Sequence, residues 1–541
     1  MPSSSPFSRA SLAVLLALGC AVAQHEEPAT EPFARYRQCI VRKPFFFHTM
    51  GRDALSLSHQ AEALQQLAAD YGRPQIEPEY SRYTIASMLG RDFDNAGFLD
   101  ALVALRTAST NPADAWLWTN VLRIESDLTR TDEVLAIARE ATASWQRAAA
   151  IVAIGASRRG DVAAAITPNC VTLPPKDKEG ERMLLLGAMT NALWDNRARV
   201  NDESYRNALT AYIGLLDPKV GLPKLGRVQM TRTLQAILRS PAQFEDPAAW
   251  LAFLARGDVK SSSSQTSAQP SFFGIESDGE RFCYVLDLSD SMCIKVPNEH
   301  KGPITGPKPK RPKNAILTES DLPWHLIKSR WDLAREQLRI SLSRLQPDQW
   351  FCVVWFGSDA GTLNATKGLV KATRANLDKA IKELDALVPG EPVPGVAPDG
   401  VLRGRTNLFG GLRRAFAVHG GGHANGPAYV EEKPLADGCD TIFLLSDGAP
   451  TADDFMVLDK DYGEGEVVKS IEYGGKAPRM QTLEYYGPYI FDQFLIEDVR
   501  RMNLFRRVRI HCIGLGEANT ELLRGIAGQG GGETFFVGQK R

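Results

Sequence analysis

The chain has 541 residues, of which 44% are hydrophobic and 23% are charged, and this ordinary globular composition argues against extensive disorder. A chain of this length favours about two to four domains over a single core. Lys and Arg together number 63 and Asp and Glu number 64, so the net charge of -1 provides no general positive field for nucleic acids or anionic membranes. No apolar stretch of about 18 residues follows the N-terminus, which excludes a polytopic membrane protein.

The N-terminal residues have the pattern of a secretory signal. Arg9 precedes an apolar run that ends in a small-x-small cleavage site, AVA at 21–23. We therefore predict a signal peptide over residues 1–23 and export to the periplasm, the cell surface or the medium; a buried N-terminal helix is the alternative. The letters LGC ending at Cys20 form a partial bacterial lipobox, so we expect membrane association only if Cys20 is lipidated.

The cysteines fit an exported protein without a metal-binding cysteine motif. Cys283, Cys352 and Cys512 lie inside apolar runs, and we predict that they are buried free thiols. Cys39 and Cys170 could form a disulfide in the oxidising compartment that export implies.

Residues 33–255 are predicted to form an all-α domain. Segments such as 61–72, 98–109 and 181–196 carry apolar residues at a spacing of three to four, and polar, Gly and Pro breaks separate them. The segment 144–166 resembles a HEAT-type repeat, in which two helices bury one face against the next pair. No constant period runs through the region, so a non-repetitive helical bundle remains the alternative.

The pattern changes after a Ser-rich linker at residues 256–271. Short, nearly continuous apolar runs follow, at 282–288, 350–356, 440–446, 507–516 and 533–538. Such runs are expected where strands are buried on both faces, and helical patterns lie between them. We therefore predict that residues 272–541 form an α/β domain with a doubly wound, Rossmann-like and mainly parallel sheet. The ligand site of such a sheet lies at the carboxyl ends of its strands, near the switch in strand order.

Small oxygen-bearing side chains occur on three separate loops of this predicted sheet. Asp287, Ser289 and Ser291 follow the first strand, Thr406 precedes a helix, and Asp447 follows the run at 440–446. We expect the three loops to converge above the sheet. Oxygen ligands favour a hard divalent cation such as Mg²⁺, with Mn²⁺ or Ca²⁺ as alternatives. Because hydroxyls are neutral, the bound cation would keep an attraction for an incoming carboxylate.

This pattern resembles the metal-ion-dependent adhesion site (MIDAS) of the von Willebrand factor type A (vWA) domain. The family motif is Asp-x-Ser-x-Ser, then a Thr, then an Asp usually followed by Gly, and the residues Asp287, Ser289, Ser291, Thr406 and Asp447 match it. The resemblance covers about residues 272–541. It implies that both serines bind the metal, that the threonine binds directly or through water, and that the aspartates often act through water. It also implies that a carboxylate of a partner completes the metal's shell.

The sequence departs from the family pattern in three places. Asp290 stands where many members have a small residue, often Gly, between the two serines. Segments 293–323 and 450–490 are insertions that follow strand ends near the predicted metal. These insertions either frame a recognition surface or are variable loops without a partner.

The resemblance implies an exported, metal-dependent binding module for adhesion or assembly rather than an enzyme. Its expected partner is a protein that offers a carboxylate, and no nucleic-acid partner is expected, because we interpret the basic letters GPKPKRPK at 306–313 as a solvated loop. An extracytoplasmic scaffold with a purely stabilising metal and a metal-dependent hydrolase remain as alternatives. His419 and His423 superficially resemble an esterase oxyanion loop, but the sequence has no GxSxG nucleophile motif, so a Gly-rich loop is the better interpretation.

Overall fold

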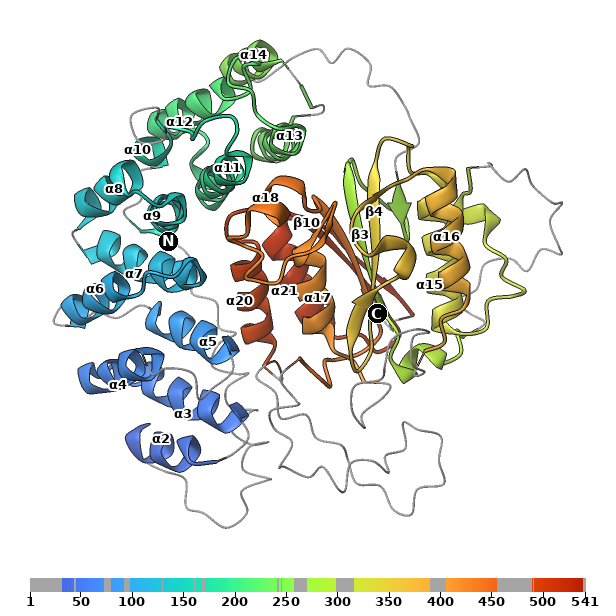
Figure 1. Ribbon diagram of the computed structural model, residues 1–541, viewed down its shortest axis with the longest axis horizontal. Coiled ribbons are helices and arrows are strands. Elements are labelled where there is room, and N and C mark those ends of the chain that lie inside the picture. Colours follow the sequence, from blue (N-terminus) through green and yellow to red (C-terminus); the bar gives the residue numbers. More distant parts are fainter. Residues whose placement is uncertain are drawn as a thin grey trace.

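The computed structural model describes residues 32–42, 45–72, 79–91, 98–128, 130–158, 162–167, 172–240, 243–244, 246–256, 270–297, 316–389, 405–454, 489 and 491–538. Within them, a helical region packs beside an α/β region (Figure 1). The predicted signal peptide and Cys20 lie outside the described residues, as do nearly all of the predicted linker and most of both predicted insertions.

The first part of the chain is helical. Its α-helices are α2 (Pro32–Ile40), α3 (Phe45–Leu57), α4 (Ala61–Gly72), α5 (Glu79–Leu89), α6 (Leu99–Ala108), α7 (Ala115–Leu128), α8 (Thr131–Glu140), α9 (Ser144–Ala156), α10 (Val162–Ile166), α11 (Glu179–Asp195), α12 (Glu203–Gly214), α13 (Lys224–Leu238) and α14 (Pro247–Arg256). The helices expected from the apolar spacing at 61–72, 98–109 and 181–196 are confirmed as α4, α6 and α11.

These helices form a curved stack of two layers (Figure 1). The odd-numbered helices from α3 to α13 each pack against the next and form the inner layer, and the even-numbered helices from α4 to α14 lie outside them. Helix pairs that bury their faces against neighbouring pairs are characteristic of helical solenoids. Helix length varies from 5 residues in α10 to 17 in α11, which explains why the sequence shows no constant period.

The α/β region is built on a sheet with strand order β11-β10-β9-β3-β4-β5, in which β6 also pairs with β4. The strands are β3 (Arg281–Asp287), β4 (Trp350–Phe356), β5 (Ala360–Thr362), β6 (Val370–Lys371), β9 (Thr441–Ser446), β10 (Arg509–Leu515) and β11 (Thr534–Val537). Five strands pair in parallel, whereas β5 and β6 run antiparallel to β4. The prediction of helices followed by an α/β domain with a mainly parallel sheet is confirmed, and each of the five apolar runs corresponds to a strand.

The sheet separates two hydrophobic cores because successive side chains along a strand point to opposite faces. On one face, Tyr284 and Leu286 pack with helices α15 (Arg330–Ser343) and α16 (Arg374–Asp385). On the other face, Val285 belongs to a core that also contains buried residues of the helical region. Helices α17 (Leu408–Ala417), α18 (Glu432–Asp437), α20 (Asp492–Met502) and α21 (Thr520–Gly530) lie on this second face, toward the inner layer of the stack (Figure 1).

The cysteines of the sheet are thiols in this second core. Cys283, Cys352 and Cys512 are buried and free, as predicted from their apolar surroundings in sequence. A disulfide between Cys39 and Cys170 stays a prediction, because Cys170 lies outside the described residues.

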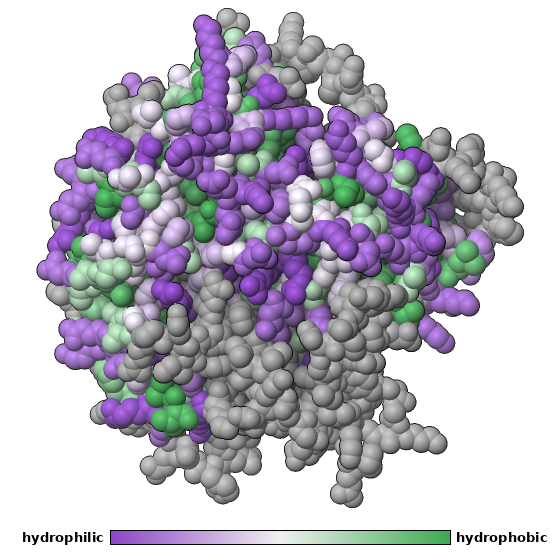
Figure 2. All heavy atoms as spheres, in the orientation of Figure 1, coloured by the Kyte–Doolittle hydropathy of each residue, from purple (hydrophilic) through white to green (hydrophobic). Residues whose placement is uncertain are grey.

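The surface of the described part is mostly hydrophilic. Figure 2 shows polar side chains over most of the coloured surface on this face, with hydrophobic residues scattered among them. The exposed large hydrophobic residues, such as Val41 and Leu326, are far apart in the chain. No helix of the described residues has the length and apolar character needed to cross a bilayer.

The helical and α/β regions meet in a close, specific interface. Gly187 in α11 packs directly on the backbone that follows α20, where an added Cβ would lie only 1.8 Å from the carbonyl oxygen of Phe505. The Asn191 amide donates to the carbonyl oxygen of Leu504 at 2.7 Å. Arg501 of α20 lies against the ring of Tyr83 in α5, with its guanidinium carbon 3.5 Å from the ring centroid. At Gly187 the backbones of the two regions are therefore in direct contact.

We predict that Gly187→Ala will destabilise the whole protein. A methyl group at this position must push α11 away from the α/β region, so the free energy of unfolding should fall by about 1–3 kcal/mol or more. The matched control is Gly528→Ala in α21, where an added Cβ meets no atom within 4 Å. Because this helical site is exposed, the free energy of unfolding of Gly528→Ala should rise by about 0.5–1 kcal/mol. Urea unfolding followed by circular dichroism measures both changes, and equal stability of the two variants would contradict the interface.

Candidate functional site

Three loops meet where the strand order of the sheet reverses. From β3 the chain continues to β4 on one side, whereas β9 pairs with β3 on the other side. In open α/β sheets, such a reversal separates neighbouring loops and opens a crevice at the carboxyl ends of the strands. Asp287 is the last residue of β3, and Asp447 directly follows the last residue of β9. The topology therefore brings two carboxylates from distant parts of the chain to one edge.

Hydrogen bonds join four of the five predicted site residues into one continuous network. The Ser289 backbone N–H donates to Asp287 Oδ1 at 2.9 Å, and the hydroxyls of Ser289 and Ser291 lie 2.9 Å apart. The Ser291 hydroxyl then donates to Asp447 Oδ1 at 2.6 Å. Ser289 directly precedes a 3-10 turn, Asp290–Cys293, so the chain tightens here and both hydroxyls come together. Asp290 is only partly buried.

Thr406, the fifth predicted site residue, is held through hydrogen bonds of its backbone. Its N–H donates to the Thr451 hydroxyl at 2.9 Å, and its carbonyl oxygen accepts from the Thr451 N–H at 3.0 Å, which ties it to the loop after β9. The next residue, Asn407, donates its N–H to the carbonyl oxygen of Gly357 at 2.7 Å. Within the described residues, the Thr406 hydroxyl itself makes no hydrogen bond. It is buried but stands outside the hydrogen-bonded group.

The two carboxylates lie in an environment that disfavours negative charge. Asp287 is fully buried, and burial together with the nearby charge of Asp447 raises its pKa to about 7, although hydrogen bonds from Ser289 and Ser446 oppose the shift. Burial also raises the pKa of Asp447, while Ser291 and Arg330 oppose that shift. The pair therefore needs a positive charge nearby if both carboxylates are to be ionised.

Arg330 supplies a positive charge that the sequence analysis did not identify. One terminal nitrogen of its guanidinium donates to Asp447 Oδ2 at 2.8 Å, and the other pairs with Glu517. Arg330 is the first residue of α15, where Ser329 and Asp332 form a capping box at the helix start. That capping box, Ser-x-x-Asp before an apolar helical pattern, is the sequence signal that would have placed Arg330 at the helix terminus.

The donors of this site are all oxygens. Two carboxylates and the hydroxyls of Ser289 and Ser291 are joined at the edge, and the backbone of Thr406 is tied to the loop that follows β9. The described residues hold no cluster of three or more His, Cys, Asp or Glu side chains that could bind a metal. Oxygen donors without nitrogen or sulfur match the preference of a hard divalent cation such as Mg²⁺. The chemistry of the residues thus fits the ion that the vWA resemblance implies.

Other polar groups noted in the sequence are accounted for by local structure. His419 and His423 lie in the small hairpin β7 (Val418–His419) and β8 (Gly422–His423), where His419 Nδ1 accepts from the Gly421 N–H at 3.0 Å. This agrees with a Gly-rich loop rather than an oxyanion loop.

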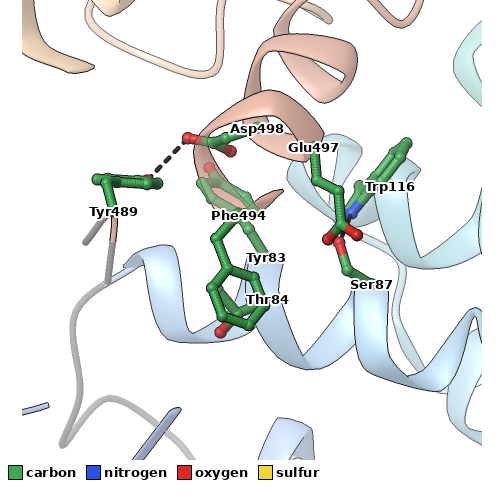
Figure 3. Close-up of a pocket in the computed structure, with 8 residues that line it drawn as sticks. All are labelled: Tyr83, Thr84, Ser87, Trp116, Tyr489, Phe494, Glu497 and Asp498. Carbon is green, nitrogen blue, oxygen red and sulfur yellow. Dashed lines mark hydrogen bonds between the residues drawn. The ribbon is translucent and has the colours of Figure 1, made fainter. Parts of the chain in front are cut away.

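A crevice between the two regions is a second place to consider (Figure 3). It lies between α5, α7 and α20 and is lined by Tyr83, Thr84, Ser87, Trp116, Tyr489, Phe494, Glu497 and Asp498. Its volume is about 10 Å³, roughly the space that one water molecule needs. Two of its polar groups are already used, since Tyr489 donates to Asp498 at 2.8 Å and Trp116 donates to Ser87 at 2.9 Å. The crevice is therefore part of the interface rather than a ligand pocket.

Comparison with models of protein families gave no match, and neither did comparison with curated proteins. Among solved structures, the chain is similar to a von Willebrand factor type A protein from Catenulispora acidiphila, with 13% sequence identity and a TM-score of 0.26. The similarity covers 48% of this chain and 38% of that chain, which is less than two thirds of its length. A similarity this weak carries no argument about function, which has to come from the residues themselves.

We predict that Arg330→Met will strongly destabilise the protein in a buffer free of divalent cations. The substitution leaves the buried Asp447 without its ion-pair partner, and breaking a buried pair from one side costs about 3–5 kcal/mol. Arg339→Met is the matched control, because Arg339 lies on the same helix and pairs with the half-exposed Asp385. We expect the free energy of unfolding of Arg339→Met to fall by about 1 kcal/mol or less. Urea unfolding with EDTA present measures both variants, and similar losses would show that the Arg330–Asp447 pair is unimportant.

Proposed function

We propose that this protein is an exported, metal-dependent binding module for adhesion or assembly. In this proposal Asp287, Ser289, Ser291, Thr406 and Asp447 hold a divalent cation, Mg²⁺ first, that captures an acidic group of a protein partner. The observation that carries the proposal is the hydrogen-bonded network that links four of these residues at the reversal of strand order. The motif that resembles the MIDAS of vWA domains supports it from the sequence.

The residues favour capture of a carboxylate rather than catalysis. Ser289 and Ser291 are hydrogen-bonded to each other and to Asp447, so neither hydroxyl is paired with a histidine or lysine that would activate it as a nucleophile. A bound cation would supply positive charge to an incoming carboxylate. The two carboxylates would formally balance a divalent cation, but Asp447 also pairs with Arg330, so cation and arginine together would leave net positive charge at the site for an incoming carboxylate.

An extracytoplasmic scaffold is the second candidate function. It is favoured by the core that the helical region shares with one face of the sheet, since such a body is rigid and large even without a ligand. In that case the cation would stabilise the fold and partners would bind elsewhere. The two candidates differ in whether chelation releases a partner.

Asp447→Ala should abolish binding of Mg²⁺, because it removes one of the two carboxylates of the site. Isothermal titration of the purified wild-type chain with Mg²⁺ or Mn²⁺ should give a saturable heat. Thermal unfolding of the wild type should show a higher melting temperature when either ion is present. Asp378→Ala, which removes a half-exposed carboxylate on α16, should leave both unchanged. If the folded wild-type chain gives neither heat nor thermal shift, the proposed function is wrong. If a protein partner stays bound in the presence of EDTA, that result would instead favour the scaffold.

Arg330→Met should bind the cation more tightly than the wild type. Arg330 holds Asp447 Oδ2, so a cation that approaches this carboxylate meets a positive charge already in place. We expect the Mg²⁺ dissociation constant of Arg330→Met to fall about tenfold, a coupling of roughly 1.4 kcal/mol. The melting temperature of this variant should also rise further on adding Mg²⁺. An unchanged affinity beside normal wild-type binding would mean that Arg330 and the cation do not compete.

A further inference from the structure

A polar cavity lies at the amino edge of the sheet, opposite the edge that holds Asp287 and Asp447. It is enclosed by α13 of the helical region, the end of α11 and the turn between α21 and β11. Its polar and aromatic lining consists of Trp194, Gln229, Arg232, Thr233, Arg507 and Arg509. The cavity has a volume of about 30 Å³, roughly two to three times what one water molecule needs. A small polar ligand, or the head group of a larger one, is of the right size.

Two of the three arginines in this cavity are neutralised by neighbouring carboxylates. Arg232 pairs with Asp278 at 2.9 Å and with Asp440 at 3.1 Å. Arg509 pairs with the same oxygen of Asp278 at 2.9 Å. Two carboxylates are thus already shared by two guanidinium groups, and neither is left to balance the third.

Arg507 is the third arginine, and no carboxylate in the described part of the chain lies within ion-pair distance of it, although the charge of Asp195 acts on it from farther away. Among the described residues its guanidinium takes part in no hydrogen bond and no ion pair, and its Nη2 atom is buried. Burial lowers its pKa to about 10, with Asp195 opposing the shift, so it remains protonated at neutral pH. A buried N–H donor without an acceptor is costly, and an acceptor that enters the cavity would remove that cost.

The Arg507 side chain is held in place before any ligand arrives. Its guanidinium carbon lies 4.0 Å from the ring centroid of Trp194, and Arg197 lies over the same ring at 4.3 Å. Gly531, with φ of +65°, turns the backbone beside it, and a Cβ there would lie 3.1 Å from Nη2. A guanidinium that is already fixed by stacking loses little freedom when it binds an anion.

The remaining groups of the cavity also favour negative charge. Burial, together with the charges of Arg509 and Arg232, lowers the pKa of nearby His511 to about 3, and Asp278 opposes the shift. The amide oxygen of Gln229 is buried and has no hydrogen-bond partner. Oxygen and nitrogen of an amide are assigned from their surroundings, so a turned Gln229 amide would offer an N–H donor to an anion instead.

We propose that this cavity binds a small oxyanion, which Arg507 holds through its free N–H groups. Planar guanidinium groups match the paired oxygens of phosphate, sulfate and carboxylate groups. Because the lining comes from both regions, the anion would bridge α13 and the start of β10 and strengthen the interface between them. This site is independent of the proposed cation site, and it uses none of its residues.

The test is a titration of the full chain with inorganic phosphate, in EDTA and at constant ionic strength set with chloride. Saturable heat and a rise in melting temperature are expected for the wild type. Arg507→Met should weaken phosphate binding at least about tenfold, and Arg507→Lys, which keeps the charge but loses the planar fork, should be intermediate. Arg197→Met is the matched control, since Arg197 stacks on the same tryptophan without lining the cavity, and it should bind normally.

Parallel titrations with sulfate and acetate distinguish a tetrahedral anion from a carboxylate, and saturable binding of either class that depends on Arg507 supports the proposal. Absence of saturable binding by all three anions would overturn it and leave a cavity that holds only water. Equal weakening by Arg507→Met and Arg197→Met would overturn it as well. If Arg507→Met does not fold, the comparison of Arg507→Lys with Arg197→Met decides the question.

Discussion

The placement of two carboxylates at one buried edge is the constraint on which the α/β region depends. Asp287 ends β3, Asp447 directly follows β9, and both are buried. Burial and the charge of Asp447 disfavour the ionised form of Asp287. Both carboxylates of such a pair stay ionised only with positive charge beside them. Arg330 provides positive charge within the chain itself, and the proposed divalent cation would provide more. In the proposed function a cation would share the Asp447 carboxylate with Arg330, so Arg330 would influence its affinity.

The sheet could be predicted because its strands are buried on both faces. Five nearly continuous apolar runs gave five parallel strands, and the oxygen-bearing residues directly after them had to lie at the carboxyl edge. Asp287, Ser289 and Ser291 are close in sequence, so their proximity required little more than a turn. The position of Asp447 followed from the rule that the carboxyl ends of parallel strands lie at the same edge of the sheet.

Features that depend on tertiary packing could not be predicted in the same way. Arg330 follows the first strand only after a long insertion, and its contact with Asp447 exists because α15 starts at the carboxyl edge. The close approach of Gly187 to Phe505 joins residues more than 300 positions apart, and no local pattern marks it. The unpaired charge of Arg507 is equally invisible, since it depends on which carboxylates its neighbours have already taken.

Strand β9 connects the two polar edges of the molecule. Asp440 directly precedes it and Asp447 directly follows it, and each carboxylate pairs with an arginine from another element. At the amino end the partner is Arg232 of the helical region, and at the carboxyl end it is Arg330 of α15. The Arg232–Asp440 pair thus ties the helical region to the strand that ends at the proposed binding edge.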